Sequence, residues 1–232
     1  MKIAILWAKM TNFADYSIQI IHINKFLKTK ETMKKGCSGT AVLIIVAIVA
    51  VVWGIGVYNG LVTAEQKVET AWAQVENVYQ RRADLIPNLV ETVKGYAKHE
   101  SETLEGVVEA RANATKISID PSNMTPEDLQ QYQAAQNQVG SALGRLIAIR
   151  EDYPDLKANQ NFLELQGQLE GAENRITVER NKFNEIAKEY NTKIKRFPTN
   201  LLAGLFGFGE KPYFKAQEGA DKAPKVDFGT SN

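Results

Sequence analysis

Cysteine and histidine are almost absent from this sequence of 232 residues, which holds one cysteine and two histidines. A single cysteine excludes a disulfide framework and a cysteine-rich metal site, because both need several thiols. The two histidines, His22 and His99, argue against a zinc centre or a catalytic site built on imidazole groups. We therefore expect no metal ion and no other cofactor.

An excess of charge of either sign is also absent, because 28 Lys and Arg residues face 27 Asp and Glu residues. The net charge of +1 argues against a dedicated nucleic-acid-binding protein. The balance is uneven along the chain: residues 1–64 hold seven basic and two acidic residues, and residues 65–232 hold 21 and 25. The chain thus has a basic beginning and a mildly acidic body.

The motifs of common enzyme classes are missing as well. The sequence has no His-Glu-x-x-His zinc motif, no glycine-rich phosphate loop, no Gly-x-Ser-x-Gly nucleophile turn and no pair of cysteines. We expect no catalytic residues, and an enzyme of unrecognised type is the most remote of the interpretations that follow.

One long hydrophobic run stands out against these absences. Residues 41–62 are almost wholly apolar, and no charged residue lies between Lys35 and Glu65. At ~1.5 Å per residue this run forms a helix of roughly 33 Å, about the thickness of the hydrocarbon core of a bilayer. We predict a single transmembrane helix, with Trp53 and Tyr58 at the membrane interface near its C-terminal end.

The flanks of the run predict its orientation. Five lysines lie between positions 25 and 35, whereas Lys67 is the first basic residue after the run. The positive-inside rule then places the N-terminus in the cytoplasm and the body outside. The alternative is a signal peptide cleaved after Ala64, but the apolar core of a signal peptide has only ~7–15 residues.

Residues 1–32 show neither helical periodicity nor turn signals. Met33-Lys34-Lys35 followed by an apolar run has the form of a natural protein start. We expect residues 1–32 to be an extension assigned to the chain in error, and the alternative is a short disordered cytoplasmic tail.

Residues 63–196 show helical periodicity almost throughout, and no stretch alternates as a strand does. We predict an all-α protein in which the transmembrane helix is followed by an antiparallel, up-down-up-down four-helix bundle with long, coiled-coil-like helices. The apolar stripes fall at spacings of three, four and seven, at Val68, Trp72, Val75, Tyr79, Ile86, Val90 and Val93, at Leu129, Tyr132, Val139, Leu143 and Leu146, and at Leu169, Ile176, Phe183, Ala187, Tyr190 and Ile194.

Local signals predict where these helices begin and end. Thr125 can cap a helix that has Pro126 in its first turn. Pro154 should break the chain, Asp155 should cap the last helix, and that helix should end by Arg196, before Phe197-Pro198. Pro87 leaves two interpretations. Either it kinks one long helix that ends near His99, with Ser101 capping the next, or it lies in the first turn of a new helix capped by Asp84. The continuous stripe favours the kink.

Three charged residues interrupt the apolar stripes, namely Arg82, Glu173 and Arg180. One interpretation is a structural polar network that fixes the register of the helices. The other is that their charged ends extend along the surface to solvent.

The C-terminal stretch 198–215 is rich in glycine and aromatic residues and too short to span a bilayer. Two interpretations fit it. It packs as an apolar lid on the bundle, which we favour, or it docks at the membrane interface through Phe206, Phe208, Tyr213 and Phe214. Residues 216–232 are expected to be disordered. The predicted organisation is an extension at 1–32, a basic flank and transmembrane helix at 33–62, a bundle at 63–197, this tail, and a disordered end.

Several long motifs resemble the LemA family. They are Arg81-Arg82-Ala83-Asp84-Leu85-Ile86-Pro87-Asn88-Leu89-Val90-Glu91-Thr92-Val93-Lys94-Gly95-Tyr96-Ala97, then Asn174-Arg175-Ile176, Phe197-Pro198-Thr199-Asn200, and Lys211-Pro212-Tyr213-Phe214. The resemblance covers roughly residues 33–216. It implies a bacterial single-pass membrane protein with a helical bundle outside the span, and it implies no catalytic residue.

Two functions follow as hypotheses. The first is a non-enzymatic interaction or scaffold module, anchored in the bacterial inner membrane, that binds proteins of the cell envelope. The second is a lipid-contacting, membrane-shaping protein that assembles with copies of itself through the apolar tail. Both imply the lipid bilayer as a partner, and a homo-oligomer fits either one.

Overall fold

The computed structural model describes residues 38–215, so the predicted extension, the basic flank before the apolar run and residues 216–232 lie outside the described part of the chain. Every regular element between residues 38 and 215 is a helix, which confirms the all-α prediction. The chain divides after Trp53 into two units, and the packing described below is that of residues 54–215.

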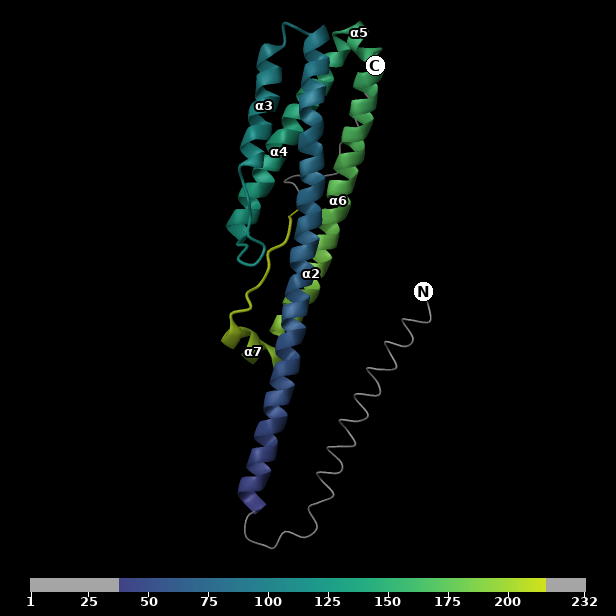
Figure 1. The fold of residues 1–232 in the computed structure, drawn as a ribbon. Coiled ribbons are helices and arrows are strands. Elements are labelled where there is room, and N and C mark those ends of the chain that lie inside the picture. Colours follow the sequence, from purple (N-terminus) through teal and green to yellow (C-terminus); the bar gives the residue numbers. More distant parts are fainter. Residues whose placement is uncertain (1–37, 216–232) are drawn as a thin grey trace, which may run out of the picture. The chain divides into compact units, whose positions relative to one another are not determined.

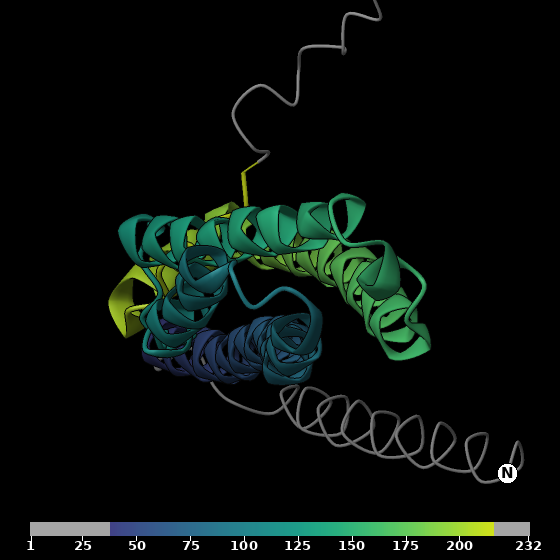
Figure 2. The same ribbon diagram turned by 90° about the horizontal axis from the view of Figure 1, so that it is seen from above.

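Five helices and two single turns make up this part of the chain. The helices are α2 (Ser38–Tyr96), α3 (Ser101–Thr115), α4 (Pro126–Ala148), α6 (Gln160–Lys195) and α7 (Thr199–Phe206), and the turns are η2 (Ile149–Glu151) and α5 (Pro154–Lys157). Figures 1 and 2 show α3 beside both α2 and α4, with α6 running along the other side of the group.

The first part of α2 is long and apolar enough to cross a membrane, and no residue of its most apolar stretch is buried. Large apolar side chains such as Leu43 (69%) and Val52 (63%) are open to their surroundings. Exposed apolar side chains on every face are typical of a helix that lies in lipid and unusual for one that lies in water. The structure thus supports a single membrane-span candidate in the region that the sequence predicts.

Pro87 lies inside α2, which continues through it to Tyr96. Proline has no backbone N–H, so the carbonyl group four residues earlier, that of Ala83, loses its helical donor. Arg111 of α3 replaces that donor, because its Nε donates to the Ala83 carbonyl oxygen at 2.8 Å. A single helix passes through Pro87 because a neighbouring helix satisfies the freed carbonyl group.

The helix boundaries confirm the predicted cap at Thr125 and the predicted end of the last helix by Arg196, and they correct two other predictions. Thr125 caps α4 in a capping box, because its Oγ1 accepts from the N–H of Asp128 and its own N–H donates to the Asp128 carboxylate. Ser101 does not cap α3: the cap position is Glu100, which makes no side-chain cap. Asp155 does not cap the last helix, because Pro154 opens only the single turn α5, and Asn159 caps α6.

Two apolar clusters fill the space between the helices. One surrounds Trp72 and Phe183, and the other surrounds Leu146 and Phe162. Fully burying each large apolar side chain contributes ~1.5–3 kcal/mol. Each of α2, α4 and α6 passes from one cluster to the other, and polar side chains occupy the crossing points.

Candidate functional site

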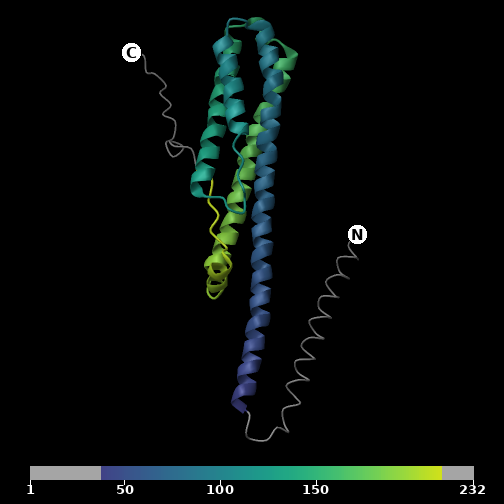
Figure 3. The ribbon, with the colours of Figure 1, turned by 60° about the vertical axis from the view of Figure 1, so that its left-hand side comes forward.

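After α7 the chain turns back and lies against the helices as residues 208–215, which we call the strap (Figures 1 and 3). Gly207 makes this turn with a φ of 78°, a left-handed conformation that glycine adopts without strain. The N–H of Phe208 donates to the carbonyl oxygen of Ala203 at 2.9 Å and closes the end of α7. The strap therefore starts from a well-defined helix end.

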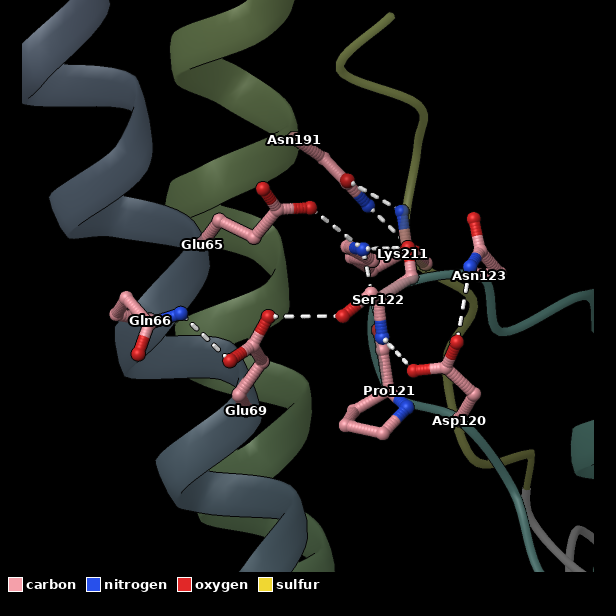
Figure 4. Close-up of polar contacts among 9 residues, drawn as sticks. All are labelled: Glu65, Gln66, Glu69, Asp120, Pro121, Ser122, Asn123, Asn191 and Lys211. Carbon is pink, nitrogen blue, oxygen red and sulfur yellow. Dashed lines mark hydrogen bonds and ion pairs between the residues drawn. The ribbon is translucent and has the colours of Figure 1, made fainter.

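Lys211 of the strap has a side chain that is only 3% exposed. Its Nζ donates to the carbonyl oxygen of Ser122 at 2.6 Å and to that of Pro121 at 3.1 Å (Figure 4). The third neighbour is a carboxylate, with Glu65 Oε1 at 2.8 Å. An ammonium group has three donors, and here three oxygens surround it. One buried charge therefore joins the strap, α2 and the loop that precedes α4.

The loop that presents these two carbonyl groups is held by side chains of its own (Figure 4). Asp120 accepts from the N–H of Ser122 at 3.0 Å and from Asn123 Nδ2 at 2.8 Å. The hydrogen bond from Asn123, followed by that from Ser122, holds the pKa of Asp120 below its usual value. Ser122 Oγ also donates to Glu69 Oε1 at 3.1 Å, which ties the loop to α2.

Two asparagines of α6 bind the backbone of the strap. Asn191 Nδ2 donates to the Lys211 carbonyl oxygen at 2.7 Å, and its Oδ1 accepts from the Lys211 N–H at 2.9 Å. Asn184 forms the same pair with Phe214, with distances of 3.0 and 2.8 Å. Each side-chain amide thus pairs with both backbone groups of one strap residue, as a neighbouring β-strand would.

The side chain of Phe214 enters the first apolar cluster. Its ring stacks on Trp72 with centroids 6.0 Å apart and meets the edge of Phe183 at 5.6 Å. The guanidinium of Arg180 lies 4.7 Å from the ring centroid on the outer side. A buried lysine and a buried phenylalanine, three residues apart, therefore anchor the strap.

An open groove between α4 and α6 continues from the end of the strap. Its volume is about 1270 Å³, larger than a typical small-molecule pocket of ~300–1,000 Å³. Polar and apolar groups share its walls about equally, and Gln133 Nε2 and Arg180 both donate to the Lys215 carbonyl oxygen there. Its polar lining residues include Gln130, Gln136, Asn137, Ser141, Glu173 and Thr177.

The structure brings two of the three predicted network residues together. Arg82 is 3% exposed and lies 2.6 Å from Glu173 Oε1, with a second contact of 2.7 Å to Gln136 Oε1. These three side chains lie where α2, α4 and α6 cross between the apolar clusters. Arg180 makes no direct contact of this kind with Arg82 or Glu173. It donates to the strap and lies beside Tyr79, whose ring Arg82 contacts.

Buried tyrosines border this polar layer. The guanidinium of Arg82 lies 5.2 Å from the ring centroid of Tyr79, and Tyr132 packs against that ring. Burial raises the pKa of both phenols, so neither serves as a base near neutral pH. Between residues 38 and 215, no three His, Cys, Asp or Glu side chains form a potential metal site.

The predicted interface aromatics separate into two groups. Trp53 (43%), Tyr58 (40%), Phe206 (53%) and Tyr213 (43%) are partly exposed, and the rings of Phe206 and Phe208 both contact that of Tyr58. Phe214 departs from the expectation, because it is 6% exposed. It is enclosed by Trp72 and Phe183, so its apolar surface is already covered by protein.

The residues that hold the strap were not among the predicted site residues; they are Glu65, Asn184, Asn191 and Lys211. One signal was present: Asn184 and Asn191 lie seven residues apart, next to the apolar positions Phe183 and Tyr190. Amide side chains repeated at that spacing along one helix face indicate a ligand that runs along the helix. Lys211 lies in a motif that resembles the LemA family, but nothing in the pattern indicated its burial, because a lysine in an irregular segment is normally exposed.

Comparison with known proteins gives a consistent family. The model of the LemA family matches residues 71–228. Protein LemA of Metamycoplasma hominis is 27% identical over 76% of this chain and 75% of its own length. Magnetosome protein MamQ 2 of Paramagnetospirillum magneticum and magnetosome protein MamQ of Magnetospirillum gryphiswaldense are each 27% identical over 71% of this chain, and the match spans 66% of their length.

Proposed function

This chain belongs to the LemA family, and from that premise we propose that it is a non-enzymatic, single-pass bacterial membrane protein that presents a helical interaction module outside the cytoplasm. The observation that carries the proposal is the groove between α4 and α6, which is broad and lined by hydrogen-bonding side chains. Such a surface suits an extended protein ligand better than a small substrate. The apolar run of α2 supplies the anchor, and the basic residues before it support a cytoplasmic N-terminus in the inner membrane.

We further infer that α2, α3, α4 and α6 form an up-down-up-down four-helix bundle. The link between α2 and α3 covers only residues 97–100, and a short link favours antiparallel neighbours. The links 116–125 and 149–159 are longer but still join helices that pack in the same group. An antiparallel order brings the end of α6 back to the beginning of the bundle, where Lys193 Nζ donates to the Gly60 carbonyl oxygen. The relatives named as magnetosome proteins support a membrane-associated role.

Photocrosslinking in cells tests the interaction function. A photoreactive residue placed at Ser141 or Thr177, in the groove, is expected to capture a small, recurrent set of envelope proteins. The same residue at Glu105, exposed on α3 and outside the groove, serves as the matched control. Adducts only with lipid or with other copies of this chain would contradict the proposal.

A second candidate function, contact with lipid, is favoured by the surface of α7. Leu201 (65%), Leu205 (74%) and the preceding Phe197 (80%) are exposed, and Lys195 and Arg196 lie beside them. Phe206 contacts Tyr58, which belongs to the last part of the apolar run. An apolar surface with adjacent basic residues, next to a membrane helix, suits the headgroup region of a bilayer.

Nitroxide accessibility in reconstituted full-length protein tests this contact. A label at Leu205→Cys, in a Cys37→Ser background, is expected to be relaxed more by lipid-soluble oxygen than by a water-soluble nickel complex. The control is Val178→Cys, which is 60% exposed on α6. Equal relaxation of the two labels by oxygen and by the nickel complex would show that α7 does not contact the membrane.

A further inference from the structure

We propose that the strap and the groove beyond it mark one binding site for extended peptides, which selects a lysine followed at the third position by an aromatic residue. The strap is the resident ligand of this site, and a segment of a partner protein with the same chemistry takes its place. The inference rests on the proposed interaction function and names the kind of ligand that the module takes. Peptide recognition of this kind draws affinity from backbone hydrogen bonds and specificity from side-chain pockets.

Two side-chain amides of α6, those of Asn184 and Asn191, bind the strap through its backbone. A side-chain amide can pair with the N–H and C=O of the same residue only where both groups point to one side, as in extended chain. Pro212 favours this conformation at Lys211, because a residue before proline is restricted to the extended region. Contacts to backbone groups do not depend on which residue supplies them. Asn184 and Asn191 can therefore hold an extended segment of another protein equally well.

The spacing of the two asparagines along α6 matches the spacing of their partners along the strap. Asn184 and Asn191 are seven residues apart, which is ~10.5 Å along a helix. Their partners Phe214 and Lys211 are three residues apart, which is ~9 Å in a chain of polyproline II type, where every third residue faces the same side. The two amides thus meet the backbone at residues whose side chains fill the two buried positions. The direction is antiparallel, because the later asparagine binds the earlier strap residue.

The surroundings of the Lys211 and Phe214 side chains determine which residues fit at these two positions. Two carbonyl groups and the Glu65 carboxylate surround the lysine, which suits an ammonium group and excludes an acidic residue. Trp72, Phe183 and Arg180 surround the aromatic ring, which an aliphatic side chain fills poorly. The site therefore selects Lys-x-x-Phe or a close relative of it.

The open groove indicates why a partner displaces the strap. Because the strap belongs to the same chain, it competes with any partner peptide at an effective concentration of about millimolar. A peptide that binds only weakly therefore cannot displace it. A longer partner segment extends past the position of Lys215 into the groove between α4 and α6, where Ser141 and Thr177 add contacts. These additional contacts give a partner peptide an advantage over the same eight residues alone.

The test uses the full-length chain in detergent micelles, with the double substitution Lys211→Ala and Phe214→Ala to release the strap. The probe is a fluorescent synthetic peptide with the sequence of residues 208–215. It is expected to bind the released protein about tenfold or more tightly than the wild type. A peptide with alanine at the two anchor positions should not bind. Asn184→Ala in the released protein should weaken binding about tenfold, because two hydrogen bonds are lost.

A second protein guards against misfolding of the released variant. A protease site placed between Gly207 and Gly209 allows the chain to fold with its strap bound and then to be cut. The labelled peptide is expected to exchange into the cut protein while circular dichroism remains helical. Failure to bind either protein, or equal binding of the alanine peptide, would overturn the proposal.

Crosslinking between differently tagged copies separates the possible occupants. A crosslink from the strap of one copy to α6 of another would show that a second copy of this chain occupies the site, and would overturn the proposal of a partner peptide. The two experiments also distinguish an error in this inference from an error in the proposed interaction function. Envelope proteins captured at Ser141 or Thr177 without any binding of the peptide would retain the module and reject this ligand.

Discussion

Lys211 and Lys195 form ion pairs of nearly equal length in different surroundings. The Lys211–Glu65 pair measures 2.8 Å with side chains 3% and 22% exposed, and the Lys195–Glu210 pair measures 2.7 Å with both side chains 59% exposed. Water competes for the exposed pair and screens it, whereas the buried charges depend on each other. Distance alone therefore does not rank these contacts.

We expect Lys211→Met to lower the free energy of unfolding by about 3 kcal/mol, because it leaves Glu65 and two carbonyl groups without their cation. Lys195→Met should lower it by less than about 1 kcal/mol. Urea unfolding of both full-length variants in micelles measures the difference. Equal losses would show that the strap is not held by its buried lysine.

Acid should weaken the start of α4. The hydrogen bonds from the side chain and the backbone N–H of Thr125 hold the pKa of Asp128 below its usual value. A lowered pKa in the folded state stabilises the protein above the unfolded value, and this contribution is lost as the pH falls through the folded value. Asp128→Asn should therefore lower the unfolding temperature near neutral pH and have little effect below the folded pKa. A temperature difference that is constant with pH would contradict this assignment.

At the scale of elements, α2 and α3 are coupled through the proline in α2. Arg111→Met should cost about 1–2 kcal/mol, because the Ala83 carbonyl group then has no donor. In a Pro87→Ala background residue 87 regains an N–H, so the same substitution should cost less. A double-mutant cycle measured by urea unfolding gives the coupling energy. Arg145→Met on the exposed face of α4 is the control, and additive effects would reject the coupling.

Helices and strap differ in how far the sequence predicts them. The apolar spacing of α2, α4 and α6 is a local pattern, and so is the cap at Thr125 before Pro126, so both were predicted; the reciprocal bond from the Thr125 N–H to Asp128 was not. The end of α6 at Lys195 was predicted, but the N-terminal caps of α3 and α6 were not. Ser101 and Asp155 are residue types that often cap helices, but α3 begins at Ser101 itself and Asp155 lies inside the single turn α5. The strap has no periodicity, and its position depends on asparagines about 20 to 30 residues away in sequence.

At the scale of the whole molecule, the polar layer of Arg82, Gln136 and Glu173 separates two apolar clusters on three helices. Glu173 is 48% exposed, so Glu173→Met should cost less than a fully buried pair would, about 1–2 kcal/mol. Glu170→Met, one turn earlier and exposed, is the control in the same unfolding experiment. If both substitutions lowered the free energy of unfolding equally, the polar layer would make no specific contribution to stability.

The candidate site was predicted in part at this scale. Arg82 and Glu173 were identified because charges within an apolar stripe need partners. Arg180 was assigned to the same network, which it borders through Tyr79, but its contacts with the strap were not predicted, because helical spacing gives a face and not a partner. The sequence located the aromatic tail, but only its packing shows that Phe214 is enclosed while the side chains of Leu201 and Leu205 are open.

The two asparagines on α6 also limit how the chain length can vary among relatives. The interval from Lys211 to Phe214 is set by two turns of helix, so one residue inserted or deleted there would leave one amide without its backbone pair. Residues before Gly207 or after Lys215 carry no such restriction. Insertions and deletions in the tail should therefore cluster outside this four-residue interval, and the interval itself should keep a constant length.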